Sequence, residues 1–438
     1  MRDILVVLIF TIGAVNAIRR PYYGALLWVW VGLMNPHRLT YGFAYSLPLA
    51  QIAVIVTLLG MLAKSKEIRW PGGGPLHSLL LLMLWMGITT LAAIHVEPSI
   101  ERYVFLSKIV FMTVVISLVV RTREEIIGLI WVIVASMNFY GIKGGIFTIL
   151  SGGNHRVWGP PESVIEGNNE LAVALVIIVP LMFFLANHVS IGLSGFLATE
   201  FRKKKIKQAL VFSIALCGIA AMGSQSRGAL LAISAMLAVL WWRSDNKLPL
   251  TIMFVFMIPV VLMLMPESWY SRMETIRTYE EDASAMGRIN AWTMAFNIAV
   301  DRITGAGFAT ASPDIYARYA PNPNFVIVAH SIYFQVLGEH GFIGLGLYLL
   351  MWLLTYIMAG RIIKLTKGRK DLNWAMMLAS MSKVSLIGFA VGGAFLSLAY
   401  WDMPFYLLVV VVVLRSHVQE VIVKEESPMF DGRQGIRS

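Results

Sequence analysis

The segment AHSIYFQVLGEHGFIG, residues 329–344, contains a histidine where a side chain could act as a base. His330 follows a polar stretch with two prolines, residues 319–325, and precedes a long apolar run, so we expect it near the N-terminus of a helix. The helix dipole there disfavours imidazolium, and a ring that is neutral near pH 7 can accept a proton. The alternative is a structural histidine bonded to a backbone carbonyl. Glu339, nine residues further on and about 13 Å along a helix, is too distant to orient the ring.

The cations of the long connection at residues 266–329 are all arginines. A guanidinium is planar and permanently charged, and it can bind two phosphate oxygens at once. This choice of cation therefore favours a phosphate-binding surface. The alternative is that the arginines pair with acidic residues of the same connection. The arginines are Arg272, Arg277, Arg288, Arg302 and Arg318, and the acidic residues are Glu267, Glu274, Glu280, Glu281, Asp282, Asp301 and Asp314.

Two arginines lie where helices are expected to begin. Arg227 follows Ser224 and Ser226, either of which is a plausible N-cap. The unpaired amides of such a helix start and the guanidinium together make an anion site. Arg288 lies near the start of a predicted amphipathic helix at 286–303, and the two arginines are the main candidates for binding phosphate. The apolar face of that helix consists of Ile289, Trp292, Phe296, Ala299 and Ile303.

A glycine- and proline-rich segment, GGNHRVWGPPE at residues 152–162, supplies second-rank candidates. His155 and Arg156 could contact the substrate, and Trp158 could stack on a sugar ring or lie in an interfacial aromatic belt. The acids Glu162 and Glu166 could bind sugar hydroxyls.

The composition indicates the elements that must position these residues. Of 438 residues, 58% are hydrophobic and 14% are charged, and the mean hydropathy is +0.71. These values are typical of an all-α protein that crosses the membrane many times. Counting three ambiguous short runs, we expect about twelve transmembrane helices. Long apolar runs occur at 46–63, 76–95, 103–120, 125–150, 170–188, 207–222, 228–242, 248–265, 331–360 and 376–398, and the short runs at 3–18, 22–34 and 404–415.

Lysine and arginine in short loops predict the orientation. The basic loops alternate along the chain, so they can all lie on the cytoplasmic side, and the formal charge of +11 is mostly this topology signal. We therefore expect no nucleic-acid partner. The basic loops are 64–69, 121–123, 202–207, 243–247 and 361–370, joined by Arg19 and Arg20. We expect four parts: membrane helices at 1–265, an outward loop with amphipathic helices at 266–329, transmembrane helices at 330–415 and a cytoplasmic tail at 416–438.

The histidine segment carries a resemblance to a known family. His330 and Ser331, then nine residues, Gly341, two residues and Gly344 resemble the histidine-glycine motif of the bacterial O-antigen ligase and polymerase superfamily. SRGA at 226–229 is similar to the same family.

Two further stretches extend the resemblance. GNNELAVAL at 167–175, with Asn168 and Asn169, is similar to an asparagine-alanine segment of that family. Residues 1–150 look more like a subgroup of exosortase-associated O-glycosylation ligases.

The resemblance implies a glycosyltransferase in the bacterial inner membrane, with its site on the periplasmic face. The donor would be a glycan on undecaprenyl diphosphate, and the acceptor a sugar hydroxyl of lipid A-core. The leaving diphosphate needs cations, which Arg227 and Arg288 could supply, and the hydroxyl needs a base, which His330 could be. We expect no metal, cofactor or nucleotide. Membrane lipids and the two glycolipids are the expected partners.

Two alternatives stay open at this point. Within the enzyme class, a polymerase or a protein O-oligosaccharyltransferase would need the same donor and an activated hydroxyl. Outside it, a transporter of lipid-linked glycans could use the arginines as a transit site. A transporter is expected to show ionisable groups along a membrane path and an internal repeat. Ionisable residues in or near the spans are Lys108, Glu339, Lys383 and Asp402, but no repeat is visible.

Overall fold

The computed structural model describes residues 1–65, 68–189, 199–243 and 283–426, and a few single positions between 247 and 270. All regular elements within these residues are helical, which confirms the expected all-α class. The predicted span at 248–265 and the start of the long connection, 266–282, lie outside the continuously described residues. The helices are α1 Arg2–Arg19, α2 Pro21–Met34, η1 Pro36–Leu39, η2 Phe43–Ser46, α3 Leu49–Ala63, α4 Gly74–Leu91, α5 Val96–Val119, α6 Arg123–Leu150, α7 Asn168–Asn187, α8 Glu200–Gly223, α9 Arg227–Arg243, α12 Ala283–Asp301, α13 Pro313–Tyr319, α14 Ile332–Thr366, α15 Asn373–Gly393 and α16 Asp402–Glu426.

Eight helices in the described part of the chain are long and apolar enough to cross a membrane. Two shorter apolar helices, α3 and α9, add to these. The chain is therefore a multi-span membrane protein, and the larger count of about twelve stays a prediction. The eight are α4, α5, α6, α7, α8, α14, α15 and α16.

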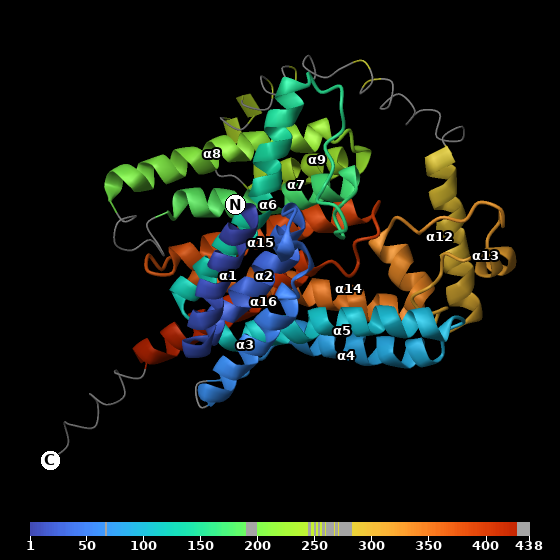
Figure 1. The fold of residues 1–438 in the computed structure, drawn as a ribbon, viewed down its shortest axis with the longest axis horizontal. Helices are drawn as coiled ribbons and strands as arrows, with labels where there is room; N and C mark the ends of the chain where they lie inside the picture. Colours follow the sequence, from blue (N-terminus) through green and yellow to red (C-terminus); the bar gives the residue numbers. More distant parts are fainter. Residues whose placement is uncertain are drawn as a thin grey trace.

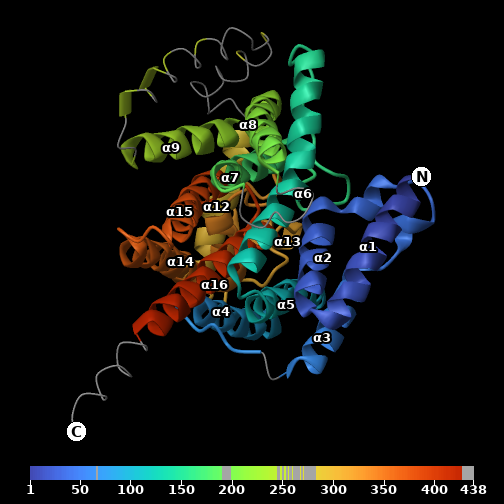
Figure 2. The ribbon, with the colours of Figure 1, turned by 90° about the vertical axis from the view of Figure 1, so that its left-hand side faces the viewer.

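The centre of the bundle is formed by α7, α15 and α16 (Figure 1). The short run predicted at 404–415 is part of the 25-residue helix α16, and its residues Phe405–Leu414 are all at most 2% exposed. A helix that is apolar on every side is stable only where protein or lipid surrounds it completely. Around this centre, α4 lies beside α14, α5 lies beside α4 and α16, and α1, α2 and α3 form a group against α5 and α6 (Figure 2).

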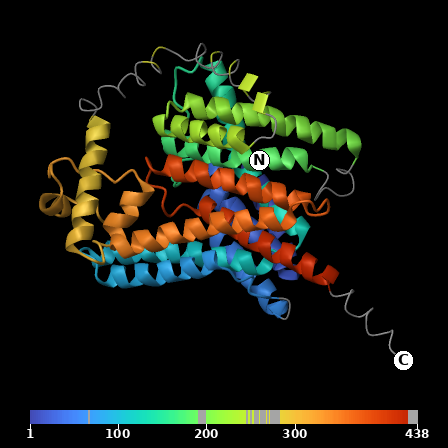
Figure 3. The same ribbon diagram turned by 180° about the vertical axis from the view of Figure 1, so that it is seen from behind.

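The predicted amphipathic helix at 286–303 is confirmed as α12, which stands across the end of α14 (Figure 3). Small and apolar residues of one side, including Ala291 and Ala295, are buried against the protein. The opposite side leaves Ile289 and Phe296 exposed, and Ile303, also exposed, follows the end of the helix. An exposed apolar stripe on a helix that crosses the bundle end is what a helix lying in a membrane interface requires.

Candidate functional site

His330 lies two residues before α14, near a helix N-terminus as predicted. Its backbone conformation could not be predicted from the sequence. Its φ is 44°, in the left-handed region that side chains other than glycine rarely adopt. Its backbone N–H donates to Ser397 Oγ at 3.0 Å, and Trp292 Nε1 donates to the preceding Ala329 carbonyl at 2.7 Å. Contacts from α12 and from the loop after α15 therefore hold the histidine in this conformation. Strained backbone that neighbouring groups impose is common where a side chain must be aimed.

The surroundings of His330 favour the neutral imidazole, and partial burial is the main reason. Loss of solvent lowers the pKa of His330 below its ordinary value, and the nearby charge of Arg288 lowers it further. The predicted neutral state therefore has a different principal cause from the helix dipole that suggested it. A half-buried ring whose neutral form is favoured suits a proton acceptor.

The charge of Arg288 acts at the starts of three helices. The residue lies near the beginning of α12, and its charge acts on His330 before α14 and on Glu170 in the first turn of α7. Arg288 and His330, two of the three predicted catalytic residues, are therefore close enough for the charge of one to act on the other. Glu170 was not a candidate in the sequence, because an acid in the first turn of a helix usually serves only the helix dipole.

The loop between α8 and α9 joins the same region through Asn168. The side-chain amide of Asn168 donates to the Ser224 carbonyl at 2.7 Å, and Ser226 Oγ accepts from the backbone N–H of Ala229 at 3.2 Å. Of the two expected N-caps, Ser226 therefore makes the capping bond, and Arg227 is the first residue of α9. Gln225 has a φ of 57°, so this turn is also in a left-handed conformation.

Two observations place the start of α9 near His330. A Cβ added to Gly228, the residue after Arg227, would lie 3.4 Å from the Cβ of Phe395. Phe395 is two residues before Ser397, which holds the His330 backbone. The predicted anion site at the start of α9 therefore adjoins the histidine loop.

The other predicted residues lie at the edge of this region. His155, Arg156 and Trp158 are exposed, and their loop is tied to the α8–α9 turn because Val157 N–H donates to the Gly223 carbonyl at 3.3 Å. Asn169 is half-buried in the first turn of α7, whereas Ser331 is buried and its hydroxyl makes no cap bond.

The two acids proposed to bind sugar are already engaged. Glu162 forms an ion pair with Arg38 at 3.0 Å and accepts from the Tyr45 hydroxyl at 3.0 Å. Glu166 accepts from the Glu162 backbone N–H at 3.1 Å. These contacts join the 151–167 loop to the N-terminal helices, so a structural role accounts for both acids.

The glycines that follow the histidine have a structural explanation. Gly341 has φ 67° and ψ −172° and breaks α14, and a Cβ there would lie 2.2 Å from the Ile303 carbonyl oxygen. A Cβ on Gly344 would lie 2.3 Å from the Cβ of His340 and 3.4 Å from Trp85. The glycine spacing therefore lets α14 break and pack closely against the segment after α12.

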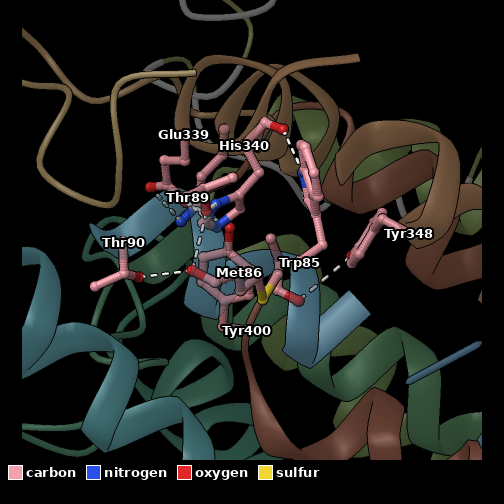
Figure 4. A network of polar contacts seen from close by, with 10 residues as sticks. Trp85, Met86, Thr89, Thr90, Glu339, His340, Tyr348 and Tyr400 are labelled. Atoms are coloured by element: carbon pink, nitrogen blue, oxygen red, sulfur yellow. Dashed lines mark hydrogen bonds and ion pairs between the residues drawn. The ribbon is translucent and has the colours of Figure 1, made fainter. Parts of the chain in front are cut away.

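A buried polar network surrounds that break (Figure 4). Glu339 accepts from the Tyr400 hydroxyl, the His340 ring shares a hydrogen bond of 2.7 Å with Thr89, and Trp85 Nε1 donates to the His340 carbonyl at 2.9 Å. Glu339 therefore belongs to this network, in agreement with the expectation that it does not orient His330.

Among the described loop arginines, pairing with an acid of the same connection is seen for Arg318, whereas Arg302 bonds to backbone carbonyls. Arg318 pairs with Asp301 at 3.3 Å, and Arg302 donates to the carbonyls of Ala92 and Gly305 at 2.6 and 2.9 Å. Arg272 and Arg277 lie outside the described residues. Among the residues that the structure does describe, no group of three or more His, Cys, Asp or Glu side chains is arranged to hold a metal ion.

Comparison with known families gives two matches along the chain. Residues 212–349 match the O-antigen ligase family, and this match includes Arg227, Arg288 and His330. Residues 1–190 match a family of unknown function. No curated protein matches the chain. The chain is thus a multi-span membrane protein in which residues 212–349 match the O-antigen ligase family and residues 1–190 match a family of unknown function.

Proposed function

We propose that the protein transfers O-antigen or a similar polysaccharide from undecaprenyl diphosphate to a sugar hydroxyl of lipid A-core. The observation that carries this proposal is a half-buried His330 whose pKa is lowered by burial and by the charge of Arg288, within the region that matches the O-antigen ligase family. Lipid-linked glycans are the substrates that this family implies. The proposal places the site on the periplasmic face of the inner membrane, as the basic loops predict.

In this mechanism His330 accepts the proton of the acceptor hydroxyl. The hydroxyl oxygen forms a bond to the anomeric carbon of the donor sugar, and the bond from that carbon to the diphosphate oxygen breaks. The electron pair of the broken bond leaves with undecaprenyl diphosphate, and the proton stays on the imidazole until solvent removes it. Burial supports this role because it disfavours imidazolium at rest, so the base is ready to accept a proton.

Arg227 and Arg288 would stabilise the negative charge that develops on the diphosphate. Arginine suits this work because its fork binds two phosphate oxygens. Arg227 is the first residue of α9, so the positive end of the helix dipole adds to its own charge. Glu170 lies close enough to Arg288 for the two charges to interact, and it would act as a positioning residue for that guanidinium.

The residues at the edge of the site would contact the glycan. Arg156, His155 and Trp158 are exposed on a loop tied to the α8–α9 turn, so a sugar chain that leaves the diphosphate site could reach them. Asn168 would instead position the turn, because its amide is bonded to Ser224.

The test is a reconstitution with purified protein and a synthetic glycan on undecaprenyl diphosphate. Lipid A-core, a second donor glycan and a hydroxyl-bearing protein are offered separately, without an energy source. Sugar on lipid A-core supports the ligase. Transfer only to the second donor identifies a polymerase, and transfer only to protein identifies an O-oligosaccharyltransferase. Absence of any glycosidic product, with donor moved across proteoliposomes, would identify a transporter.

A further inference from the structure

A cavity lies far from His330, where the ends of five N-terminal helices meet. Its volume is about 970 Å³, and residues from the ends of α1, α2, α3, α5 and α6 line it. It lies at the start of α6, whereas the loop tied to the histidine region follows the end of that helix. A helix of 28 residues is about 42 Å long, so the cavity and the proposed active site are at opposite ends of α6.

Cations outnumber acids on the walls of this cavity. Arg19, Arg20, Lys64 and Arg121 line it together with Glu124 and Glu125. One carboxylate oxygen of Glu125 accepts the backbone N–H groups of Arg121 and Thr122, at 2.9 and 3.0 Å, in a capping box at the start of α6. That carboxylate therefore serves the helix start, and the cavity keeps a net positive charge.

Two buried donors of the lining have no acceptor. Arg121 Nη2 and the indole Nε1 of Trp131 are both inaccessible to solvent and make no hydrogen bond within the described residues. Buried polar groups without partners are rare in folded proteins, because each has lost its water without gaining a replacement. Two of them on one basic cavity indicate an anionic ligand that supplies oxygen acceptors.

The surroundings of the cavity favour a lipid over a soluble anion. It lies at helix ends, where headgroups meet a membrane protein, and Tyr22, Tyr23 and Trp131 give it the aromatic lining typical of a membrane interface. On α1, Leu8 and Val15 are more than half exposed, as an acyl-chain contact requires. Basic pockets between membrane helices on the cytoplasmic side bind phospholipid headgroups in other proteins.

We infer that this cavity binds the phosphate group of an anionic phospholipid, which is neutralised by the surrounding arginines and accepts from Arg121 Nη2 and Trp131 Nε1 once these side chains turn toward it. The inference is independent of the proposed catalytic activity, because the cavity shares no lining residue with the histidine region. It assigns a lipid-binding function to the N-terminal region, whose family has no known function.

The test uses the full-length protein, purified in detergent and stripped of lipid. Phosphatidylglycerol, phosphatidylethanolamine and inorganic phosphate are added at matched concentrations. Bound lipid is measured by native mass spectrometry, and the unfolding temperature is recorded in parallel. We expect phosphatidylglycerol alone to be retained and to raise the unfolding temperature. Equal stabilisation by inorganic phosphate would show a soluble-anion site, and equal retention of phosphatidylethanolamine would show nonselective lipid contact; either overturns the inference.

Variants link binding to the cavity. Arg121→Gln should weaken phosphatidylglycerol binding by about tenfold or more, because it removes a charged hydrogen bond. Arg361→Gln is the matched control, since Arg361 is an exposed arginine near the end of α14 that does not line the cavity. Trp131→Phe keeps the ring and removes only the N–H, so it decides the question if Arg121→Gln unfolds. Unchanged binding in Trp131→Phe, or an equal loss in Arg361→Gln, would refute the site.

Discussion

Replacing His330 by alanine and by glycine separates its chemical role from its backbone strain. Both changes remove the imidazole, but only glycine adopts a φ of 44° without a steric penalty. The left-handed conformation costs other residues about 1–2 kcal/mol, and the extra freedom of glycine in the unfolded chain returns about 0.5–1 kcal/mol. The glycine variant should therefore be the more stable of the two by roughly 0.5–1 kcal/mol.

Turnover should fall equally in both variants. Loss of a general base typically lowers the rate by about 10²–10⁴-fold, which corresponds to about 3–5 kcal/mol of activation free energy. Initial rates are measured with purified protein, synthetic donor and lipid A-core, and the thermal unfolding midpoints are compared in the same detergent. Donor binding should survive in both variants, since the arginines are unchanged.

The pH profile gives the sharper result. Because burial and Arg288 lower the pKa of His330, activity should rise with pH through a midpoint below the ordinary histidine value of about 6.5. That limb should be missing from the residual activity of both variants. Near-normal turnover with an unchanged pH profile would refute the base assignment and leave His330 as a structural residue.

Four further outcomes are expected. Arg227→Ala and Arg288→Ala should each cost roughly 1.5–3 kcal/mol in kcat/KM, with partial rescue by lysine, whereas Arg318→Ala, which breaks an exposed pair with Asp301, should change little; equal losses in all three would show a general charge effect. Arg288→Ala should also move the acidic limb of the residual activity to higher pH, because the charge that lowers the pKa of His330 is gone; a limb that stays in place would remove Arg288 from the ring's surroundings. Gly341→Ala should lower the unfolding midpoint or the folded yield, since its Cβ would lie 2.2 Å from the Ile303 carbonyl at a φ of 67°, a strain of about 1–3 kcal/mol before any clash; wild-type stability would contradict the break in α14. Transfer should survive exhaustive treatment with EDTA, and a loss that added Mg²⁺ or Mn²⁺ restores would establish a metal requirement.

Sequence patterns alone were enough for the class of the protein and for several local features. Long apolar runs predict membrane helices because a bilayer requires about 20 apolar residues in each, and serine before Arg227 predicts the cap that Ser226 makes. The periodicity at 286–303 predicts α12, and Ile289 and Phe296 of the predicted apolar face are exposed, whereas Ala299 of that face is buried. These features depend on neighbours in the chain, so they can be inferred without a fold.

Only the tertiary structure decided which distant residues meet. Arg288 acts on both His330 and Glu170, and Ser397 holds the histidine backbone, although these four residues belong to separate parts of the chain. The same packing assigns Glu162 to Arg38 and makes Gly341 obligatory at the break in α14. Burial, which is the main cause of the lowered pKa of His330, is a property of the assembled helices, because residues far apart in the chain exclude the water.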